Sequence, residues 1–509
     1  MGTSYDHVPY PCNAYPQTHP GHLQTIAFLR GLQSAPAERC RYLEIGCGDG
    51  GNLTPLAYTL PGSTFLGIDL AASSIETATR HAGAMGLPNV EYQALDLMAL
   101  DPKSMGQWDY IVAHGFFSWV PEEVRVRLLD LCQEMLSPSG VAFISYNAYP
   151  GCHIRQMARE MMRYHTETAP DPDAKVKQAR ALMKFLAQSH GVDDEYGLLL
   201  RAEAERVLNY VPNHFYHDDL ADLNQPFYLH EFADLAVQHG LQYLGDADYA
   251  SMFATRYPGE VRQTLASLGD DPIRQDQYLD FIKCRRFRQT LLCRKDVALH
   301  SAAPLEVMRE LYFSSSAKPA ADDADLLDDS LVSFEGEAGL KGETNTPVAK
   351  LALAWLGHQW PRRVHFQELL STLTGPLGGE PEADKLAAVL REFVEMGAVE
   401  AHLQPVCFAT TLSERPRASA WALYQLQFGG GITTLRHQTI HIRDSFGLWL
   451  LGQLDGTKTV EGIAHAMAST VKPDAEGRLD FDKERFEARA LVHEGVQKFL
   501  QLGLLVVNR

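Results

Sequence analysis

The sequence lacks the features of a membrane protein, a disulfide-bonded secreted protein or a zinc protein. No apolar stretch among its 509 residues reaches the length of a bilayer span, and its first residues show no basic region followed by an apolar run. Its eight cysteines form no CxxC pair and no Cys/His spacing typical of a zinc site. We therefore expect free thiols, no metal ion, no membrane insertion and a cytoplasmic location.

Basic residues are scarce relative to acidic ones. The chain has 45 Lys and Arg against 64 Asp and Glu, a formal net charge of −19. Because nucleic-acid affinity rests largely on clustered Lys and Arg, we expect no nucleic-acid partner. At 45% hydrophobic residues the chain can bury a large interior, and its length predicts about two to four domains.

The first part of the chain alternates short apolar runs with amphipathic helical stretches, a pattern typical of an α/β domain with a mainly parallel sheet. Residues 121–136 begin with Pro and repeat apolar residues every three or four positions, which predicts a helix. The predicted strands, of which the last two flank this helix, are 41–46, 64–69, 90–96, 108–114 and 140–147.

After Pro150 the pattern becomes helical, which we interpret as an insertion at about residues 155–230. Two strand-like runs follow, at 240–249 and 286–295, and would complete the sheet as a terminal hairpin. We therefore place the boundary of the first domain near residue 300.

The remainder of the chain predicts a mostly helical region. Residues 314–330 are rich in Ser, Ala and Asp and indicate a linker or mobile loop. Helical patterns followed by a strand-like run at 399–408 suggest a winged-helix-like module within 301–420, and further helical patterns predict a helical domain at 421–509. The helices of the module carry acidic residues and few basic ones, so protein contact or homodimerisation is favoured over DNA binding: Glu368, Glu382, Asp384, Glu392 and Glu395.

The most informative motif follows the first predicted strand. Gly46, Gly48 and Gly51 lie between this strand and a helical pattern, where glycine lets the backbone turn sharply and approach a ligand at a helix N-terminus. The same three glycines satisfy GxGxxG, the fingerprint of dinucleotide-binding proteins. The motif alone therefore leaves an NAD enzyme and a methyltransferase open.

Acidic residues near the ends of successive strands separate the two alternatives. Asp69 closes the second strand and would accept hydrogen bonds from ribose hydroxyls, while Asp96 closes the third and would accept from an adenine amino group. Glu44 precedes the glycines and would repel a pyrophosphate, but not the sulfonium and ammonium of S-adenosylmethionine (SAM). The combination favours SAM, and we add the neighbouring residues Cys47, Asn52, Leu70, Leu97 and His114 to the predicted contacts.

The arrangement of Glu44, the glycines, Asp69 and Asp96 resembles the class I SAM-dependent methyltransferases, which have a Rossmann-like seven-stranded sheet. Further segments resemble a bacterial subgroup that carries a methyltransferase regulatory domain and includes rickettsial protein lysine methyltransferases: 9–23, 113–121, 145–151, 285–294 and 450–457. The resemblance implies that the N-terminal segment covers the SAM pocket, where Tyr10 and Gln17 would contact the cofactor. It also implies a regulatory role for residues 301–420.

Residues that follow the fourth and fifth strands are the candidates for the methyl-acceptor pocket. His114, Tyr146, Asn147 and Tyr149 are the predicted catalytic residues, with Phe117 and Trp119 beside them. The aromatic side chains are equally consistent with loop residues that cover the core, and His114 with a structural hydrogen bond.

Three functions follow from this pattern. The first is a protein methyltransferase that modifies lysine, and the second is a small-molecule O- or N-methyltransferase. The third is a SAM-binding regulatory protein without turnover.

Overall fold

The computed structural model describes residues 8, 10, 12–191, 194–379, 382–469 and 481–507. The chain folds into two compact units that we describe separately. The first unit comprises Met1–Cys12, Leu32–Thr54 and Gly62–Ser301, and the second comprises Asn13–Gly31, Pro55–Pro61 and Ala302–Arg509. The limits 1–300, 301–420 and 421–509 that we expected for the domains stay a prediction.

A seven-stranded sheet forms the centre of the first unit, with the strand order β3-β2-β1-β4-β5-β7-β6. Only β7 runs antiparallel to its neighbours, pairing with β5 on one side and β6 on the other. This confirms the predicted α/β fold and the pairing of the last two strands. The strands are β1 Arg41–Ile45, β2 Thr64–Asp69, β3 Val90–Ala94, β4 Trp108–Ala113, β5 Leu136–Asn147, β6 Leu241–Asp246 and β7 Phe287–Arg294.

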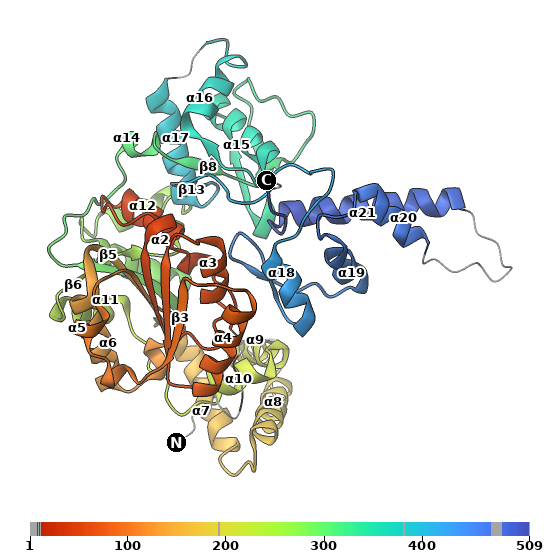
Figure 1. The fold of residues 1–509 in the computed structure, drawn as a ribbon. Helices are drawn as coiled ribbons and strands as arrows, with labels where there is room; N and C mark the ends of the chain where they lie inside the picture. Colours follow the sequence, from red (N-terminus) through yellow and green to blue (C-terminus); the bar gives the residue numbers. More distant parts are fainter. Residues whose placement is uncertain are drawn as a thin grey trace. The chain divides into compact units, whose positions relative to one another are not determined.

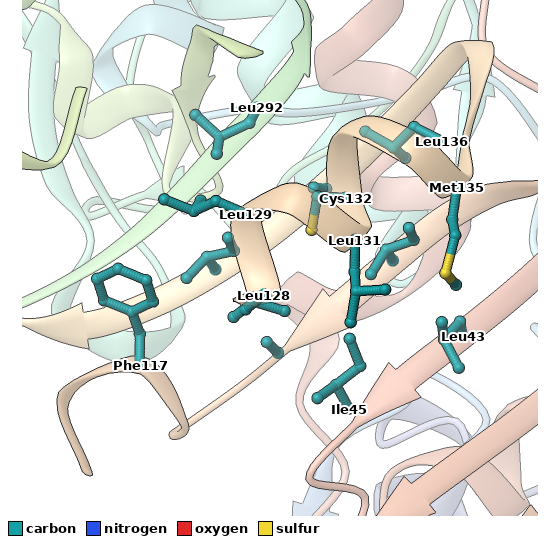
Figure 2. Close-up of a cluster of buried hydrophobic side chains, with 14 of the residues drawn as sticks. Leu43, Ile45, Phe117, Leu128, Leu129, Leu131, Cys132, Met135, Leu136 and Leu292 are labelled. Carbon is teal, nitrogen blue, oxygen red and sulfur yellow. The ribbon is translucent and has the colours of Figure 1, made fainter. Parts of the chain in front are cut away.

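Two helices cover one face of this sheet and bury its main apolar core. Helix α6, Glu122–Met135, confirms the predicted helix, and its side chains Leu128, Leu129 and Cys132 are fully buried. Figure 2 shows Leu131 of α6 pointing toward Ile45 of β1 and Leu129 lying beside Leu292 of β7. Helix α11, Leu229–Gln238, adds Phe232 and Ala236 to the same core.

The helical stretch after β5 forms a small helical cluster with its own core (Figure 1). Its core side chains include Met162, Met183 and Phe215, all fully buried. The helices are α7 Cys152–His165, α8 Pro172–Gln188, α9 Glu195–Asn209 and α10 Pro212–Asp219. Two more helices, α12 Gly259–Ala266 and α13 Pro272–Lys283, separate β6 from β7, so these two strands are not joined by a tight hairpin.

The second unit includes α2, Pro20–Leu29, and consists mainly of the C-terminal part of the chain. Its three-stranded sheet has the order β12-β8-β13, formed by Val364–His365, Tyr312–Ser314 and Glu400–His402. The helices α15 Pro347–Gln359, α16 Phe366–Thr374 and α17 Ala383–Met396 accompany this sheet, and α18 Ala420–Gln425, α19 Ser445–Gln453, α20 Val460–Ala468 and α21 Phe481–Gln501 follow it. Strand β13 is shorter than the predicted run 399–408, since Pro405 cannot donate to a strand ladder.

The predicted linker at 314–330 is wrong in part. Ser314 belongs to β8, and Lys318–Pro319 forms β9, which pairs with β10, Val332–Glu335. The buried Lys350 of α15 holds residues 325–330 in place, because its Nζ donates to Asp325 O at 2.9 Å and to Ser330 O at 3.1 Å. Composition could not reveal a cation supplied from a later helix.

Candidate functional site

The glycine loop that follows β1 turns back over the end of β2. Gly46 N donates to Ile68 O at 2.8 Å, and Gly46 and Gly48 have φ of 74° and 54°, which favours glycine. A Cβ on Gly46 would lie 2.9 Å from Phe116 Cδ2, and one on Gly48 would lie 2.4 Å from Cys12 Sγ. The loop therefore requires glycine at both positions for conformation and for space.

Glu44 is the buried carboxylate beneath this loop, with 3% of its surface exposed. Its Oε1 accepts a hydrogen bond from Asn52 Nδ2 at 2.8 Å, whereas Oε2 makes none within the described part of the chain. Burial raises the pKa of Glu44 to about 8, with Asp69 and Asp49 adding to the shift and the Asn52 hydrogen bond opposing it. A buried carboxylate oxygen without a partner fits a cationic group of a ligand.

Asp69 ends β2 and faces the glycine loop. Its Oδ2 accepts from Gly48 N at 2.9 Å and its Oδ1 accepts from Ala71 N at 2.8 Å. A carboxylate only accepts hydrogen bonds, a chemistry that fits ligand hydroxyls. The next residue, Leu70, is apolar and 61% exposed, which suits it to cover a flat ring.

Asp96 lies just beyond the end of β3 and is exposed. Its Oδ1 accepts from Met98 N at 2.9 Å and caps the short 3-10 helix η3, Leu97–Ala99. Leu97 is buried in the core, whereas Met98 is 46% exposed. Met98 is therefore an apolar side chain available to a ligand here, and sequence reasoning missed it.

The N-terminal arm contacts both the glycine loop and the helical cluster. Cys12 N donates to Asp49 Oδ2 at 3.4 Å, and the ring of Tyr10 lies 4.4 Å from that of His214. Gln17 lies in η1, Pro16–Thr18, of the second unit. Sequence reasoning missed Cys12, because nothing local to it signals a partner 37 residues away.

The four predicted catalytic residues occupy two kinds of environment. Tyr146 is 1% exposed, its ring stacks on Phe232 at 4.3 Å, and its hydroxyl lies 3.0 Å from Thr290 Oγ1. Asn147 is also buried, and its Nδ2 donates to Asn224 Oδ1 at 2.6 Å. These contacts favour a structural role for both side chains.

His114 and Tyr149 lie nearer the surface. The ring of His114 lies 5.9 Å from that of Phe143 and 6.0 Å from that of Phe287, and burial lowers its pKa to about 4. At neutral pH His114 is therefore uncharged. Tyr149 is half-buried and stacks on His153 at 4.0 Å.

Phe117 and Trp119 complete the predicted pocket. Phe117 is fully buried and packs on the rings of Phe227 and Phe232 at 5.3 and 5.1 Å, so it belongs to the core. Trp119 is half-buried with the guanidinium of Arg159 5.7 Å from its ring.

Within the described residues there is no group of His, Cys, Asp or Glu arranged to hold a metal ion. The described helices also include none that is both long and apolar enough to cross a membrane.

Family models match three segments of the chain. A methyltransferase domain matches residues 43–142, a predicted methyltransferase regulatory domain matches 211–294, and the PKMT C-terminal winged helix domain matches 414–508. A Rickettsia prowazekii protein of uncharacterized function is 30% identical over 99% of this chain and 93% of its own length. The chain belongs to the class I SAM-dependent methyltransferases.

A solved structure agrees with this family membership. PKMT2 from Rickettsia typhi, in a structure with AdoHcy, is 29% identical and matches with a TM-score of 0.87 over 98% of this chain and 100% of its own. A sequence relative, the ubiquinone biosynthesis O-methyltransferase from Paracidovorax citrulli, is 32% identical over only 24% of this chain. The glycine loop and its strand-end carboxylates thus belong to a SAM-dependent enzyme.

The matches place two domains at residues other than those we expected. The regulatory-domain model covers residues 211–294, which include α11 and the last two strands of the sheet, whereas we expected that domain at 301–420. The model named for a winged helix covers 414–508, where we expected a helical domain. Helical periodicity could not separate these cases, because both regions are mainly helical.

Proposed function

We propose that this methyltransferase transfers the methyl group of SAM to lysine side chains of a protein. The main support for the proposal is the likeness to PKMT2, where PKMT stands for protein lysine methyltransferase. This likeness extends over 98% of this chain at a TM-score of 0.87. The match with the PKMT winged helix domain supports it independently. By contrast, the ubiquinone biosynthesis O-methyltransferase from Paracidovorax citrulli matches only 24% of this chain.

In this proposal the glycine loop and the strand ends hold the cofactor. Glu44 Oε2 accepts from the ammonium group, Asp69 from the ribose hydroxyls, and Asp96 from the adenine amino group. Leu70 and Met98, both exposed, would contact the adenine ring. SAM supplies an activated methyl group on a sulfonium.

The chain's own part in the transfer is to position the acceptor and keep its amine neutral. A lysine amine has an ordinary pKa of about 10.4, so on the order of 0.1% or less is neutral at pH 7. Partial desolvation of the amine near His114 raises the neutral fraction, and His114 is itself uncharged because burial lowers its pKa to about 4. Holding the nitrogen close to the methyl carbon lowers the barrier to the transfer.

Incubation of the purified protein with labelled SAM and a lysate of its source, followed by mass spectrometry, tests the proposal. The expected result is labelled lysine in a small number of polypeptides. Label in metabolites alone, or tight cofactor binding without any transfer, would replace the proposal with the small-molecule or the regulatory alternative.

Titration with S-adenosylhomocysteine tests the cofactor assignments. Asp96→Ala should weaken binding about tenfold, the value of one lost hydrogen bond. Asp101→Ala is the matched control, because Asp101 also caps a short helix, with its Oδ1 accepting from Lys103 N at 3.1 Å. Equal affinity of the two variants would refute the role given to Asp96.

A further inference from the structure

A group of aromatic side chains lies beside the end of β5, apart from the glycine loop. Tyr228, the residue before α11, is its centre: the Tyr228 ring lies 5.2 Å from Tyr149, 5.5 Å from His230 and 6.1 Å from Phe281. The Tyr228 hydroxyl lies 3.2 Å from His153 Nε2. We call this group the aromatic surface, and it comprises Tyr149, His153, Tyr228, His230, Tyr278 and Phe281.

The aromatic surface is open to solvent although its rings contact one another. Tyr278 and Phe281 of α13 are 39% and 45% exposed, and the adjacent Ile282 is 48% exposed. His153 and His230 are exposed as well. Contiguous exposed apolar side chains are uncommon on a protein without a partner and mark an interaction site.

Its position in the sheet places this surface near the reaction. The strand order puts β4 between β1 and β5, so the end of β5 lies two strand spacings from the glycine loop, roughly 10 Å. Tyr149 follows Asn147, the last residue of β5, at the same edge of the parallel strands. A substrate segment that reaches the methyl group can therefore also contact these rings.

Two carboxylates lie beside Tyr149 and Tyr228. Glu231 and Glu160 are exposed, and Glu231 Oε2 accepts from Tyr228 N at 2.9 Å. The pKa of Tyr149 is raised, mainly by burial, with these two carboxylates adding to the effect. Arg286, which precedes β7, is paired with Glu203 at 2.7 Å. Rings with carboxylates beside them complement a cation with an apolar stem.

We propose that the aromatic surface binds a lysine side chain of the protein substrate, the rings contacting its alkyl stem and its ammonium group. This inference rests on the proposed lysine methylation, and it names the surface that selects lysine-bearing segments. The rings attract the ammonium through their faces, while Glu231 and Glu160 add longer-range attraction.

A peptide-binding experiment on the full chain tests the aromatic surface without turnover. The probes are a short fluorescent peptide that contains lysine and the same peptide with norleucine, which keeps the stem and lacks the charge. The wild type should bind the lysine peptide more tightly. Phe281→Ala should weaken this binding by about two- to five-fold, as expected for one exposed cation–π contact.

Two variants serve as controls. Tyr228→Phe keeps the central ring and should bind like the wild type, whereas Tyr228→Ala should not. Phe185→Ala removes a ring of α8 that is 63% exposed, outside the aromatic surface, and should have no effect. Equal binding of the lysine and norleucine peptides, or wild-type binding by both Phe281→Ala and Tyr228→Ala, would overturn the proposal.

The outcome is separable from that of the proposed function. If the wild type methylates no lysine but prefers the lysine peptide through these rings, lysine methylation is wrong and the aromatic surface remains a lysine-binding site. If it methylates lysine while the ring variants keep wild-type KM and peptide affinity, only the aromatic surface is wrong.

Discussion

Replacement of Glu44 by Gln should make the cofactor-free protein more stable and the enzyme worse at binding its cofactor. The carboxylate is 3% exposed and its Oε2 has no hydrogen-bond partner within the described residues, so its ionised form is disfavoured in the folded state. Its folded pKa is about 8, compared with an ordinary value of 4.5. Each pKa unit corresponds to about 1.4 kcal/mol, so the difference amounts to about 5 kcal/mol.

The raised pKa fixes the sign of the pH dependence. Between pH 4.5 and 8 the folded state binds more protons at Glu44 than the unfolded state, so the stability contributed by this group is lost as pH rises. Wild type and Glu44→Gln should therefore unfold alike near pH 4.5. By pH 9 the variant should be more stable by up to about 5 kcal/mol, measured by denaturant unfolding.

Binding should show the opposite preference. At pH 7 about nine-tenths of Glu44 is protonated, and an ammonium ligand should release most of that proton. Titration with S-adenosylhomocysteine in buffers of different ionisation enthalpy should detect the release, which Glu44→Gln should abolish. Glu91→Gln, on the exposed side chain of β3, is the matched control. Equal stability and equal proton release in wild type and Glu44→Gln would refute the reasoning.

Three further predictions concern other parts of the chain. Gly48→Ala should destabilise the protein by about 1 to 2 kcal/mol and abolish cofactor binding, because φ is 54° and its Cβ would meet Cys12 Sγ, as unfolding and titration can show. Burial lowers the pKa of His402 to about 4, so the free energy of unfolding of the second unit should fall by up to about 3 kcal/mol as pH falls from 6.5 to 4. A His402→Gln variant whose stability shows the same pH dependence would contradict this. Arg288→Met should cost about 3 to 5 kcal/mol in unfolding free energy, because it removes the guanidinium that bonds both buried carboxylates, Asp280 and Asp246. A cost below about 1 kcal/mol would show that Arg285, which also pairs with both, compensates them alone.

The sequence predicted which residues meet in the candidate site where these residues are close together in the chain. Glu44, the glycines and Asp69 lie within one strand–turn–helix unit and the next strand, so their spacing alone placed them at one edge. Tyr146 shows the limit of this reasoning. Strand β5 is buried on both faces, and its side chains do not alternate between apolar and polar. The sequence therefore could not tell which of its side chains face the core and which face a substrate.

Partners distant in sequence were not predictable. Cys12 rests on the glycine loop and Lys350 binds the segment at 325–330, but neither contact leaves a periodic pattern. The aromatic surface was likewise not predictable, because its members come from the segment after β5, from α7, from the start of α11 and from α13, which are far apart in the sequence. Only Tyr149 of its members followed a predicted strand.

The membership of α2 in the second unit has a consequence for how the chain can be made and cut. Helix α2 packs on β13, and Gln404 Nε2 donates to Gln24 Oε1 at 2.7 Å across 380 residues of chain. At roughly 5 to 20 residues per second, a ribosome takes about 20 to 80 s to deliver that partner after α2 has emerged. During this interval α2 is without its contact to β13 and without the Gln404 hydrogen bond. A fragment that ends near residue 300 would contain α2 but lack β13 and the rest of the second unit to which α2 belongs, so a cut at this point divides a compact unit.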